Sequence, residues 1–567
     1  MAEHGGTQTI VGIKANPLDG PFNGVKGNRT LLILAPQAFI PDLQLLVTHK
    51  NQTGMSAIAV SLESITSHFA GVDEPEKVKR AISYAHENLM TQYVMLVGDA
   101  ANFPVRFWFL HGHYASDIKD GITPKYPNGD VIECHPMGSY IQSDLYYANL
   151  YHHAGDYPHL INGVFDTWDA NGNGLYNEAW MDNELPIANP TGGLDTDYNP
   201  DNVDGYPDVA VGRIPARNTS DVQKYVAKVI AYETRAAPRN PIFTFVADEP
   251  YGVLDTTVSL GAKLAGKMAQ VSYLLMENDG AASPAPFSNA SPQQIASSAG
   301  ESAWLSYLGH GGPTVWGAGG VFTASDVAIT EDTIGLPVVF AAGCQTTLFM
   351  TNTPWGDETS IDVDGVTRGP FVVDSSASPG SAGLVITDTA TGQKWGNGTP
   401  GCNPLPVPTP APAALNVPNS CCANPWLFDD APGGGIAYIG DHCVAPDSYP
   451  AEIEGYLLDA YVGSTSVAPV LGDLFLSAQR QYWGGAASQI ASTKGLGDYH
   501  GIPRLYLGWL LFFCDPSLRL PSIPTASPTV SVQGLGQGVV IQHPGGSETI
   551  GRGIGLGGPT IYGKKTP

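Results

Sequence analysis

The sequence predicts an α/β fold in which two similar α/β halves follow one another along the chain. Short apolar runs typical of buried strands alternate with helical stretches, which indicates mainly parallel sheets covered by helices on both faces. Several of these runs end abruptly in small residues, as strands do at the carboxyl edge of such a sheet. Gly (67) and Pro (46) are abundant among the 567 residues. This composition indicates long ordered loops rather than a helical protein.

The first half of the predicted fold follows a polar lead-in of residues 1–27 and spans residues 28–238. Its predicted strands are 30–36, 93–99 and 208–215, and its predicted helices are 74–88 and 222–234. Residues 219–221 read Thr-Ser-Asp, and we expect them to cap the second helix.

The second half begins after a joint at residues 239–241 and spans residues 239–520. Its predicted strands are 242–249, 304–308, 337–342 and 435–440, and its predicted helix is 260–269. A long irregular segment, residues 351–421, separates the last two strands and contains a proline-rich tether. Segments of this length in a compact domain are usually functional or disordered. Residues 521–567 form a Gly/Pro-rich tail.

The charge balance narrows the range of partners. Lys plus Arg total 27 against 53 Asp plus Glu, a net charge of −26. A strongly acidic chain repels nucleic acid and anionic membrane surfaces, so neither is an expected partner. No apolar run approaches the ~20 residues of a membrane span. The first residues lack the basic start and apolar core of a signal peptide, which leaves a cytoplasmic location open.

The chain has an odd number of cysteines, so at least one thiol is free if the others pair. The seven are Cys134, Cys344, Cys402, Cys421, Cys422, Cys443 and Cys514. Four of them, Cys402, Cys421, Cys422 and Cys443, lie close together in the sequence. They are candidates for disulfides, although their pairing cannot be read from spacing.

His310 and Cys344 each follow one of two consecutive predicted strands, at turns rich in glycine. The carboxyl ends of parallel strands meet at one edge of a sheet, so these side chains can lie close together. A thiol nucleophile needs a base of this kind to become the reactive thiolate. Gly311 leaves room for a substrate carbonyl, and its N–H and that of Cys344 can form an oxyanion hole. Either residue alone would more often be structural; the pair favours thiol chemistry.

Two other hydrolase classes lack their motifs. The sequence His310-Gly311-Gly312 is similar to the oxyanion motif of lipases, but the chain contains no Gly-x-Ser-x-Gly pentapeptide. His86-Glu87 lacks the second histidine of a His-Glu-x-x-His zinc site.

The segments around both turns resemble the catalytic core of gingipain-type cysteine peptidases, family C25, which are secreted caspase-like enzymes. The matching segments are 307–311, 315–317, Phe322, 335–344 and 348–349. The resemblance extends to 208–215, to the helix end 231–233 and to 514–518, where Cys514 replaces the glycine of the family. It covers most of residues 28–520.

The resemblance implies two tandem caspase-like subdomains, the first noncatalytic and the second catalytic. It makes Cys344 the nucleophile, His310 the general base and acid, and Gly311 an oxyanion contributor. In the family an acidic residue after the first strand of the catalytic half orients the histidine. Here that strand ends in Asp248-Glu249, and Glu249 is the better match.

Two residues are candidate substrate contacts. Arginine-specific members of the family keep an Asp shortly after the orienting acid, and Asp255 is the candidate here, at a shorter spacing. Trp316, in the segment after His310, is the second candidate. The residue preferred at P1 stays open. The segment 351–421 leaves directly from the nucleophile turn, so it shapes access, is a site of self-cleavage, or is a surface insertion without a catalytic role.

Two oxygen-rich loops in the first half are candidate calcium sites. The first is Asp169, Asn171, Asn173 and Glu178, and the second is Asp195, Asp197, Asn199, Asp201 and Asp204. The first resembles the start of an EF-hand-type loop, with Glu178 two positions earlier than the usual glutamate. The family also binds calcium, which would fix these loops. The alternative is two solvated acidic loops.

The sequence therefore predicts a calcium-stabilised cysteine endopeptidase that acts on proteins or peptides. The rival hypothesis is an inactive, calcium-binding surface or interaction protein in which Cys344 and His310 are relics. The glycines that surround both residues favour the enzyme. The resemblance and the acidic composition point to an extracellular or periplasmic location, and the oligomeric state is not indicated.

Overall fold

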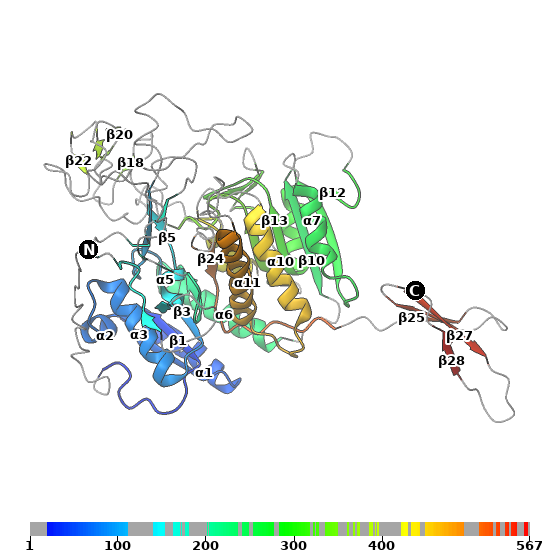
Figure 1. Ribbon diagram of the computed structural model, residues 1–567, viewed down its shortest axis with the longest axis horizontal. Helices are drawn as coiled ribbons and strands as arrows, with labels where there is room; N and C mark the ends of the chain where they lie inside the picture. Colours follow the sequence, from blue (N-terminus) through cyan, green and yellow to red (C-terminus); the bar gives the residue numbers. More distant parts are fainter. Residues whose placement is uncertain are drawn as a thin grey trace.

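The computed structural model describes most of the two predicted halves. The described residues are 20–111, 140–152, 163–180, 201–235, 241–248, 253–276, 283–349, 421–428, 433–442, 448–492 and 508–524, with short gaps in some of these ranges, and single strands within 360–395 and 529–564. The predicted class is confirmed: the chain is a mixed α/β protein whose two main sheets are largely parallel and flanked by helices (Figure 1).

The first sheet has four parallel strands in the order β2-β1-β3-β9. Its strands are β1 (Leu31–Ala35), β2 (Ala57–Ser61), β3 (Tyr93–Val97) and β9 (Ala210–Ile214). The helices of this half are η2 (Gln37–Phe39), α1 (Ile40–Gln52), α2 (Leu62–His68), α3 (Glu74–Leu89), α5 (Leu145–Ala148) and α6 (Thr219–Thr234). All residues of β1, β3 and β9 are buried, as expected for strands covered on both faces.

Smaller strands follow β3 in the chain. They are β4 (Phe107–His111), β5 (Tyr140–Gln142), β6 (Tyr151–His152), β7 (Val164–Phe165) and β8 (Ala179–Trp180). The start of α6 differs from the prediction. Asn218 is its N-cap, and the Asn218 side chain accepts a hydrogen bond from the Asp221 N–H at 3.0 Å. Residues 219–221, which the sequence predicted as the cap, form the first turn because an asparagine already satisfies the free N–H.

The second sheet has seven strands in the order β12-β11-β10-β13-β17-β23-β24, and only β24 runs antiparallel to its neighbour among its described pairs. Its strands are β10 (Ile242–Asp248), β11 (Gln270–Met276), β12 (Ser288–Asn289), β13 (Ser302–Leu308), β17 (Val338–Ala342), β23 (Ala437–Asp441) and β24 (Leu510–Phe513). The helices are α7 (Val253–Ala262), α8 (Pro292–Glu301), α9 (Ala423–Phe428), α10 (Ser448–Gly463) and α11 (Leu471–Ser492). A small antiparallel sheet consists of β14 (Gly311–Gly312), β15 (Val315–Trp316) and β16 (Phe322–Thr323).

The helix predicted at 260–269 was placed too late in the sequence. The observed helix, α7, begins at Val253 and ends at Ala262. Residues 263–266 form turns, and Gly266 adopts a left-handed backbone with a φ of +78°. A glycine of this kind just beyond a helix ends it, so the apolar pattern around Leu264 belongs to the turn instead.

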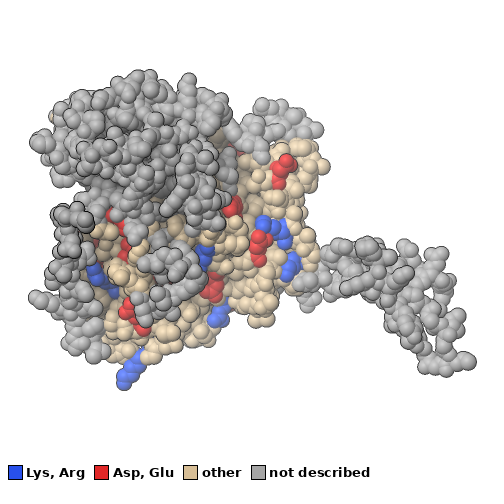
Figure 2. All heavy atoms as spheres, in the orientation of Figure 1, with Lys and Arg blue, Asp and Glu red and all other residues tan. Residues whose placement is uncertain are grey.

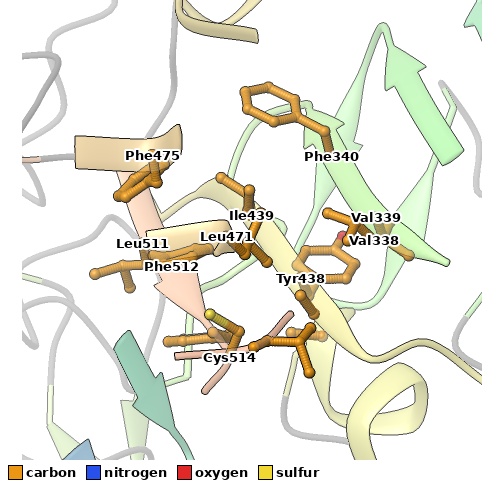
Figure 3. Close-up of a cluster of buried hydrophobic side chains, with 14 of the residues drawn as sticks. Val338, Val339, Phe340, Tyr438, Ile439, Leu471, Phe475, Leu511, Phe512 and Cys514 are labelled. Atoms are coloured by element: carbon orange, nitrogen blue, oxygen red, sulfur yellow. The ribbon is translucent and has the colours of Figure 1, made fainter. Parts of the chain in front are cut away.

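The core of the second half lies between the sheet and its covering helices. Figure 3 shows Phe340 of β17, Ile439 of β23 and Phe512 of β24 in one buried cluster with Leu471 and Phe475 of α11. The rings of Phe475 and Phe512 stack with centroids 4.2 Å apart. In Figure 1, α10 and α11 lie side by side over the sheet. This packing fixes the strands whose ends carry the site.

A buried ionic cluster joins elements of the two halves. The Lys50 Nζ of α1 lies 2.7 Å from Glu233 Oε1 of α6 and 2.7 Å from Asp515 Oδ2, just beyond β24. His49 Nε2 lies 2.8 Å from the other Glu233 oxygen. The Lys50 side chain is 1% exposed. We call Lys50, Glu233 and Asp515 the ionic clamp.

Short antiparallel strands occur where the sequence predicted irregular chain. Those within the predicted insertion are β18 (Ser360–Ile361), β19 (Thr367–Arg368), β20 (Phe371–Asp374), β21 (Val385–Asp388) and β22 (Lys394–Trp395). Those in the tail are β25 (Thr529–Val532), β26 (Val539–His543), β27 (Gly546–Arg552) and β28 (Ile561–Lys564). The tail strands form an antiparallel four-stranded sheet, drawn to one side of the main body in Figure 1.

On the face in Figure 2, Asp and Glu side chains are spread over the visible surface, several of them beside Lys or Arg. Within the described part of the chain, no helix combines the length and apolar character needed to cross a membrane.

Candidate active site

The site lies at the carboxyl edge of the seven-stranded sheet. Three neighbouring strands, β10, β13 and β17, end there side by side, with Ala247, Leu308 and Ala342 paired across them. His310 follows β13 by two residues, and Cys344 follows β17 by two residues. The structure therefore brings together the two turns that the sequence singled out, at the edge where open α/β sheets hold their sites.

The His310 and Cys344 turns are in direct backbone contact. The Gly309 N–H donates a hydrogen bond to the Ala342 carbonyl at 3.1 Å. A Cβ atom on Gly311 would lie 2.7 Å from the carbonyl carbon of Gly343 and 2.9 Å from the Cys344 nitrogen, so only glycine fits there. Both reactive residues are half-buried, and Cys344 is not in a disulfide. The Gly311 and Cys344 amides, the predicted oxyanion donors, therefore lie in adjoining turns.

Two side chains hold the backbone of His310. The fully buried Asp248, the last residue of β10, accepts a hydrogen bond from the His310 N–H at 3.1 Å through Oδ2. The Tyr307 phenol donates to the His310 carbonyl and accepts a hydrogen bond from the Gly317 N–H at 2.9 Å. Neither role was predicted from the sequence. The signal that could have indicated Asp248 is its place at the end of a predicted strand next to the His310 strand, directly before Glu249.

Trp316, predicted to contact the substrate, lies in the core instead. Trp316 is 1% exposed. The indole stacks on the Tyr307 ring with centroids 4.6 Å apart and on the Trp426 ring at 5.7 Å. Its Nε1–H donates to the Tyr438 hydroxyl at 3.1 Å. Trp316 packs beneath the His310 turn because β15 pairs back onto Gly311, which turns the indole inward.

The Cys344 turn is fixed to the neighbouring strand β23. The Thr347 N–H donates to the Asp441 carbonyl at 2.9 Å, and its hydroxyl donates to the Gly440 carbonyl at 3.1 Å. Gln345, directly after the cysteine, adopts a φ of +59°, which is unusual for a residue other than glycine. Sharp turns of this kind are a common way to present a side chain at a functional site.

The other described cysteines are buried thiols. Burial raises the pKa of Cys421 to about 12 and raises the pKa of Cys422 and Cys514 well above the ordinary value. These thiols stay protonated near neutral pH and are poor nucleophiles. Cys421 and Cys422 are not in disulfides, which corrects the expectation for these two residues. The other two cysteines of this group, Cys402 and Cys443, lie outside the described residues, as does Cys134.

Of the two other residues predicted to act in catalysis or substrate binding, the structure describes only Asp255. Glu249, the predicted orienting acid, lies outside the described residues. Asp255 is exposed in the first turn of α7, which follows β10 on the carboxyl side of the sheet. It stays a predicted substrate contact.

The two predicted calcium loops meet in their described parts. The Ala170 N–H, next to Asp169, donates to Asp201 Oδ1 at 3.0 Å, and Asp201 is buried. The other predicted ligands, Asn171, Asn173, Glu178, Asp195, Asp197, Asn199 and Asp204, lie outside the described residues. Among the residues that the structure does describe, no group of three or more His, Cys, Asp or Glu side chains is placed to hold a metal ion.

A parallel α/β sheet in which a cysteine turn packs against a histidine turn is consistent with a cysteine endopeptidase, and the family comparison gives this class. The profile of peptidase family C25 matches residues 25–383, a range that contains both turns. The chain therefore belongs to peptidase family C25.

Solved structures of similar fold include two gingipain structures. The complex of the pro- and mature domains of Porphyromonas gingivalis RgpB is 14% identical, with a TM-score of 0.45, over 89% of this chain and 82% of that one. The Arg-specific cysteine proteinase gingipain R is 14% identical, with a TM-score of 0.46, over 90% and 82%. The Saccharomyces cerevisiae separase–securin complex is 10% identical, with a TM-score of 0.27, over 61% and 16%. Among curated proteins, none matches this sequence.

Proposed function

We propose that Cys344 and His310 form the catalytic dyad of this peptidase. The observation that carries the proposal is the backbone contact between their turns, where Gly311 lies against Gly343 and Cys344. This contact supports a thiol and an imidazole at one end of the sheet, within reach of one peptide bond. Cys344 is also the half-exposed thiol among the described cysteines, whereas the three others are buried.

The dyad would cleave a peptide bond in two steps. His310 takes the proton of the Cys344 thiol, and the thiolate attacks the carbonyl carbon to form a C–S bond. The imidazolium then gives the proton to the departing amine as the C–N bond breaks, which leaves an acyl-enzyme. His310 next removes a proton from a water molecule that attacks the acyl carbon and releases the thiol.

Backbone amides would stabilise the charge that develops on the carbonyl oxygen. The N–H groups of Gly311 and Cys344 belong to the two turns in contact, which supports a shared oxyanion hole. We keep Glu249 as the predicted orienting acid for the imidazole. Asp255 would contact a substrate side chain, since it lies near the same edge of the sheet.

Removal of the thiol tests the dyad. We expect Cys344→Ala to lower kcat/KM on a peptide library at least about 1000-fold, because a covalent nucleophile cannot be replaced by its neighbours. Cys514→Ala is the matched control: it removes a buried thiol beyond β24 and should keep activity. Full activity of Cys344→Ala would assign the chemistry to another nucleophile. If the 351–421 segment is self-cleaved, purified Cys344→Ala also stays intact where the wild type is cut.

We also propose that calcium stabilises the loops around Asp169 and Asp201. The contact between Ala170 and Asp201 supports this, because it brings oxygen-rich segments from both loops together. Carboxylate, amide and carbonyl oxygens are suitable calcium ligands. Dependence on calcium near the millimolar range would fit an extracellular protein, which is our proposed location.

Thermal unfolding with calcium and with a chelator tests this proposal. A site saturated 100-fold above its Kd adds about 2.7 kcal/mol to the free energy of unfolding, so the melting temperature should rise with calcium. Asp201→Asn should reduce this rise, whereas Asp459→Asn, at an exposed site on α10, should not. An equal melting temperature with calcium and chelator would rule the stabilisation out.

A further inference from the structure

We propose that Asp248 and Tyr307 are positioning residues that hold His310 by both polar groups of its backbone. Asp248 accepts from the His310 N–H, and the Tyr307 hydroxyl donates to the His310 carbonyl. We call this arrangement the backbone clamp. The inference rests on the proposed catalytic role of His310 and adds how the imidazole is oriented.

One half of the clamp comes from a neighbouring strand. Asp248 ends β10, which pairs with β13, so its carboxyl group reaches the turn that follows β13. The contact is close: a Cβ on Gly309 would lie 2.1 Å from the Asp248 Cβ and 3.0 Å from Oδ2. Gly309 also has a φ of +153°, a conformation that other residues rarely adopt. The turn therefore needs glycine at 309 to bring the His310 N–H onto Asp248.

The other half of the clamp rests on a stack of aromatic rings. The Tyr307 ring is fully buried and lies nearly parallel to the Trp316 ring, at an angle of 3°. Trp316 in turn stacks on Trp426 of α9. The Tyr307 hydroxyl bridges the His310 carbonyl and the Gly317 N–H, so it joins the start and end of the loop. Because the ring is enclosed, the hydroxyl position is fixed by packing.

The clamp restricts the peptide groups on both sides of His310. The direction in which the imidazole leaves the backbone is then set before any substrate binds. Proton transfer needs heavy atoms within about 2.6–3.2 Å, and a misplacement of about 1 Å can cost a hundredfold in rate. A loosened clamp should therefore slow the chemical step and thiol activation, with little effect on substrate binding.

Three variants separate these effects. Tyr307→Phe removes only the hydroxyl and keeps the ring on Trp316. Asp248→Ala removes the acceptor for the His310 N–H, whereas Asp248→Asn retains an oxygen that can accept the same bond. We expect kcat to fall about 10- to 100-fold in Tyr307→Phe and Asp248→Ala, with KM within about twofold, and to be largely rescued in Asp248→Asn. The second readout is the rate at which iodoacetamide alkylates Cys344 across pH, which needs no peptide hydrolysis.

Two matched controls test for a purely structural role. Tyr461→Phe removes another buried phenol, whose hydroxyl donates to the Pro521 carbonyl at 2.8 Å, far from the His310 turn in the chain. Asp208→Ala removes another carboxyl group that accepts backbone N–H bonds, from Leu150 at 2.7 Å and Tyr151 at 3.1 Å. Both controls should lower the melting temperature as much as the clamp variants and leave kcat and alkylation unchanged.

The outcomes distinguish this inference from the proposed function. If wild-type alkylation and hydrolysis both require His310, yet Tyr307→Phe and Asp248→Ala behave like their controls, the backbone clamp is wrong and the dyad stands. If His310→Ala leaves hydrolysis intact, the dyad itself is wrong. If Asp248→Ala fails to fold, Tyr307→Phe alone decides: unchanged kcat and alkylation overturn the clamp.

Discussion

Glu454 is a carboxyl group buried against β13, the strand that leads to His310. It lies on α10, is fully buried, and accepts hydrogen bonds from Trp304 Nε1 and Ser306 Oγ of β13, each at 2.9 Å. Burial raises the pKa of Glu454 from its ordinary 4.5 to about 8, and the two hydrogen bonds offset only part of this rise. The folded protein therefore holds a proton on Glu454 at neutral pH, which the unfolded chain releases.

We predict that the stability of the Glu454→Gln variant relative to that of the wild type increases as pH rises. The folded state binds the extra proton between about pH 4.5 and pH 8, so the contribution of Glu454 to stability falls across that window. Gln keeps the size and the hydrogen-bonding groups but does not titrate. The variant-minus-wild-type difference in unfolding free energy should grow by up to about 1.4 kcal/mol per pH unit. Urea unfolding at pH 5 and pH 8 measures it.

Glu452→Gln provides the comparison on the same helix. Glu452 is exposed and accepts a hydrogen bond from the Tyr456 hydroxyl at 2.8 Å. Its substitution should leave the difference from wild type nearly the same at both pH values. A pH-independent difference for Glu454→Gln as well would show that the buried carboxyl group does not titrate in this window.

Most of the buried strands lie on apolar runs that the sequence predicted as strands, whereas β2 and β24 were not predicted although their residues are mostly apolar. β1, β3, β9, β10, β13, β17 and β23 all fall on predicted segments. β11 was missed because its first four residues, Gln-Val-Ser-Tyr, mix polar and apolar side chains and are only partly buried. Local pattern identified most of the buried strands, but partly exposed strands such as β11 depend on their sheet neighbours.

The candidate site shows the same limit. Strand ends place His310 and Cys344 at one edge of the sheet, because parallel strands share that edge. Asp248 was not predicted as a partner of the turn, since its contact is with a backbone N–H that any residue type provides. Trp316 was predicted to face the substrate, but the stack with Tyr307 forms only in three dimensions. Residue type suggests chemistry; it does not say which way an aromatic ring packs.

The ionic clamp and α6 connect the two main sheets. The Tyr225 hydroxyl of α6 donates to the Ile436 carbonyl at 3.0 Å and accepts from the Asp515 N–H at 2.8 Å. Lys50 lies between Glu233 and Asp515 at the same contact between the two sheets. The segments that resembled the family at 231–233 and 514–518 therefore meet at this contact between the two sheets.

We predict that Lys50→Met strongly destabilises the protein. It leaves two buried carboxylates without their shared cation, and breaking a buried pair in this way costs about 3–5 kcal/mol. The free energy of unfolding from denaturant titration measures the loss. A neutralised triple variant, Lys50→Met with Glu233→Gln and Asp515→Asn, should recover part of the stability because it removes the uncompensated charge.

Lys263→Met is the control for loss of an ion pair. Lys263 Nζ lies 2.7 Å from Asp459 Oδ2, but the side chains are 28% and 51% exposed. Water and salt screen such a pair, so its loss should cost less than about 1 kcal/mol. Similar losses for Lys50→Met and Lys263→Met would mean that the ionic clamp does not hold the halves together.

The chain leaves the seven-stranded sheet after β17 and returns to it at β23. Side chains next to both points are packed against the rest of the protein. Phe349, on the outgoing side, packs edge-on against Phe513, and Cys422, on the returning side, donates through Sγ to the Gly312 carbonyl at 3.3 Å. A chain cut anywhere between these points would leave two pieces of a single sheet. The first piece would carry both reactive turns, and the second would carry β23 and β24, which complete the sheet, with α10 and α11. Neither could complete its core alone, so the cut protein would persist as a two-chain complex held by fragment complementation.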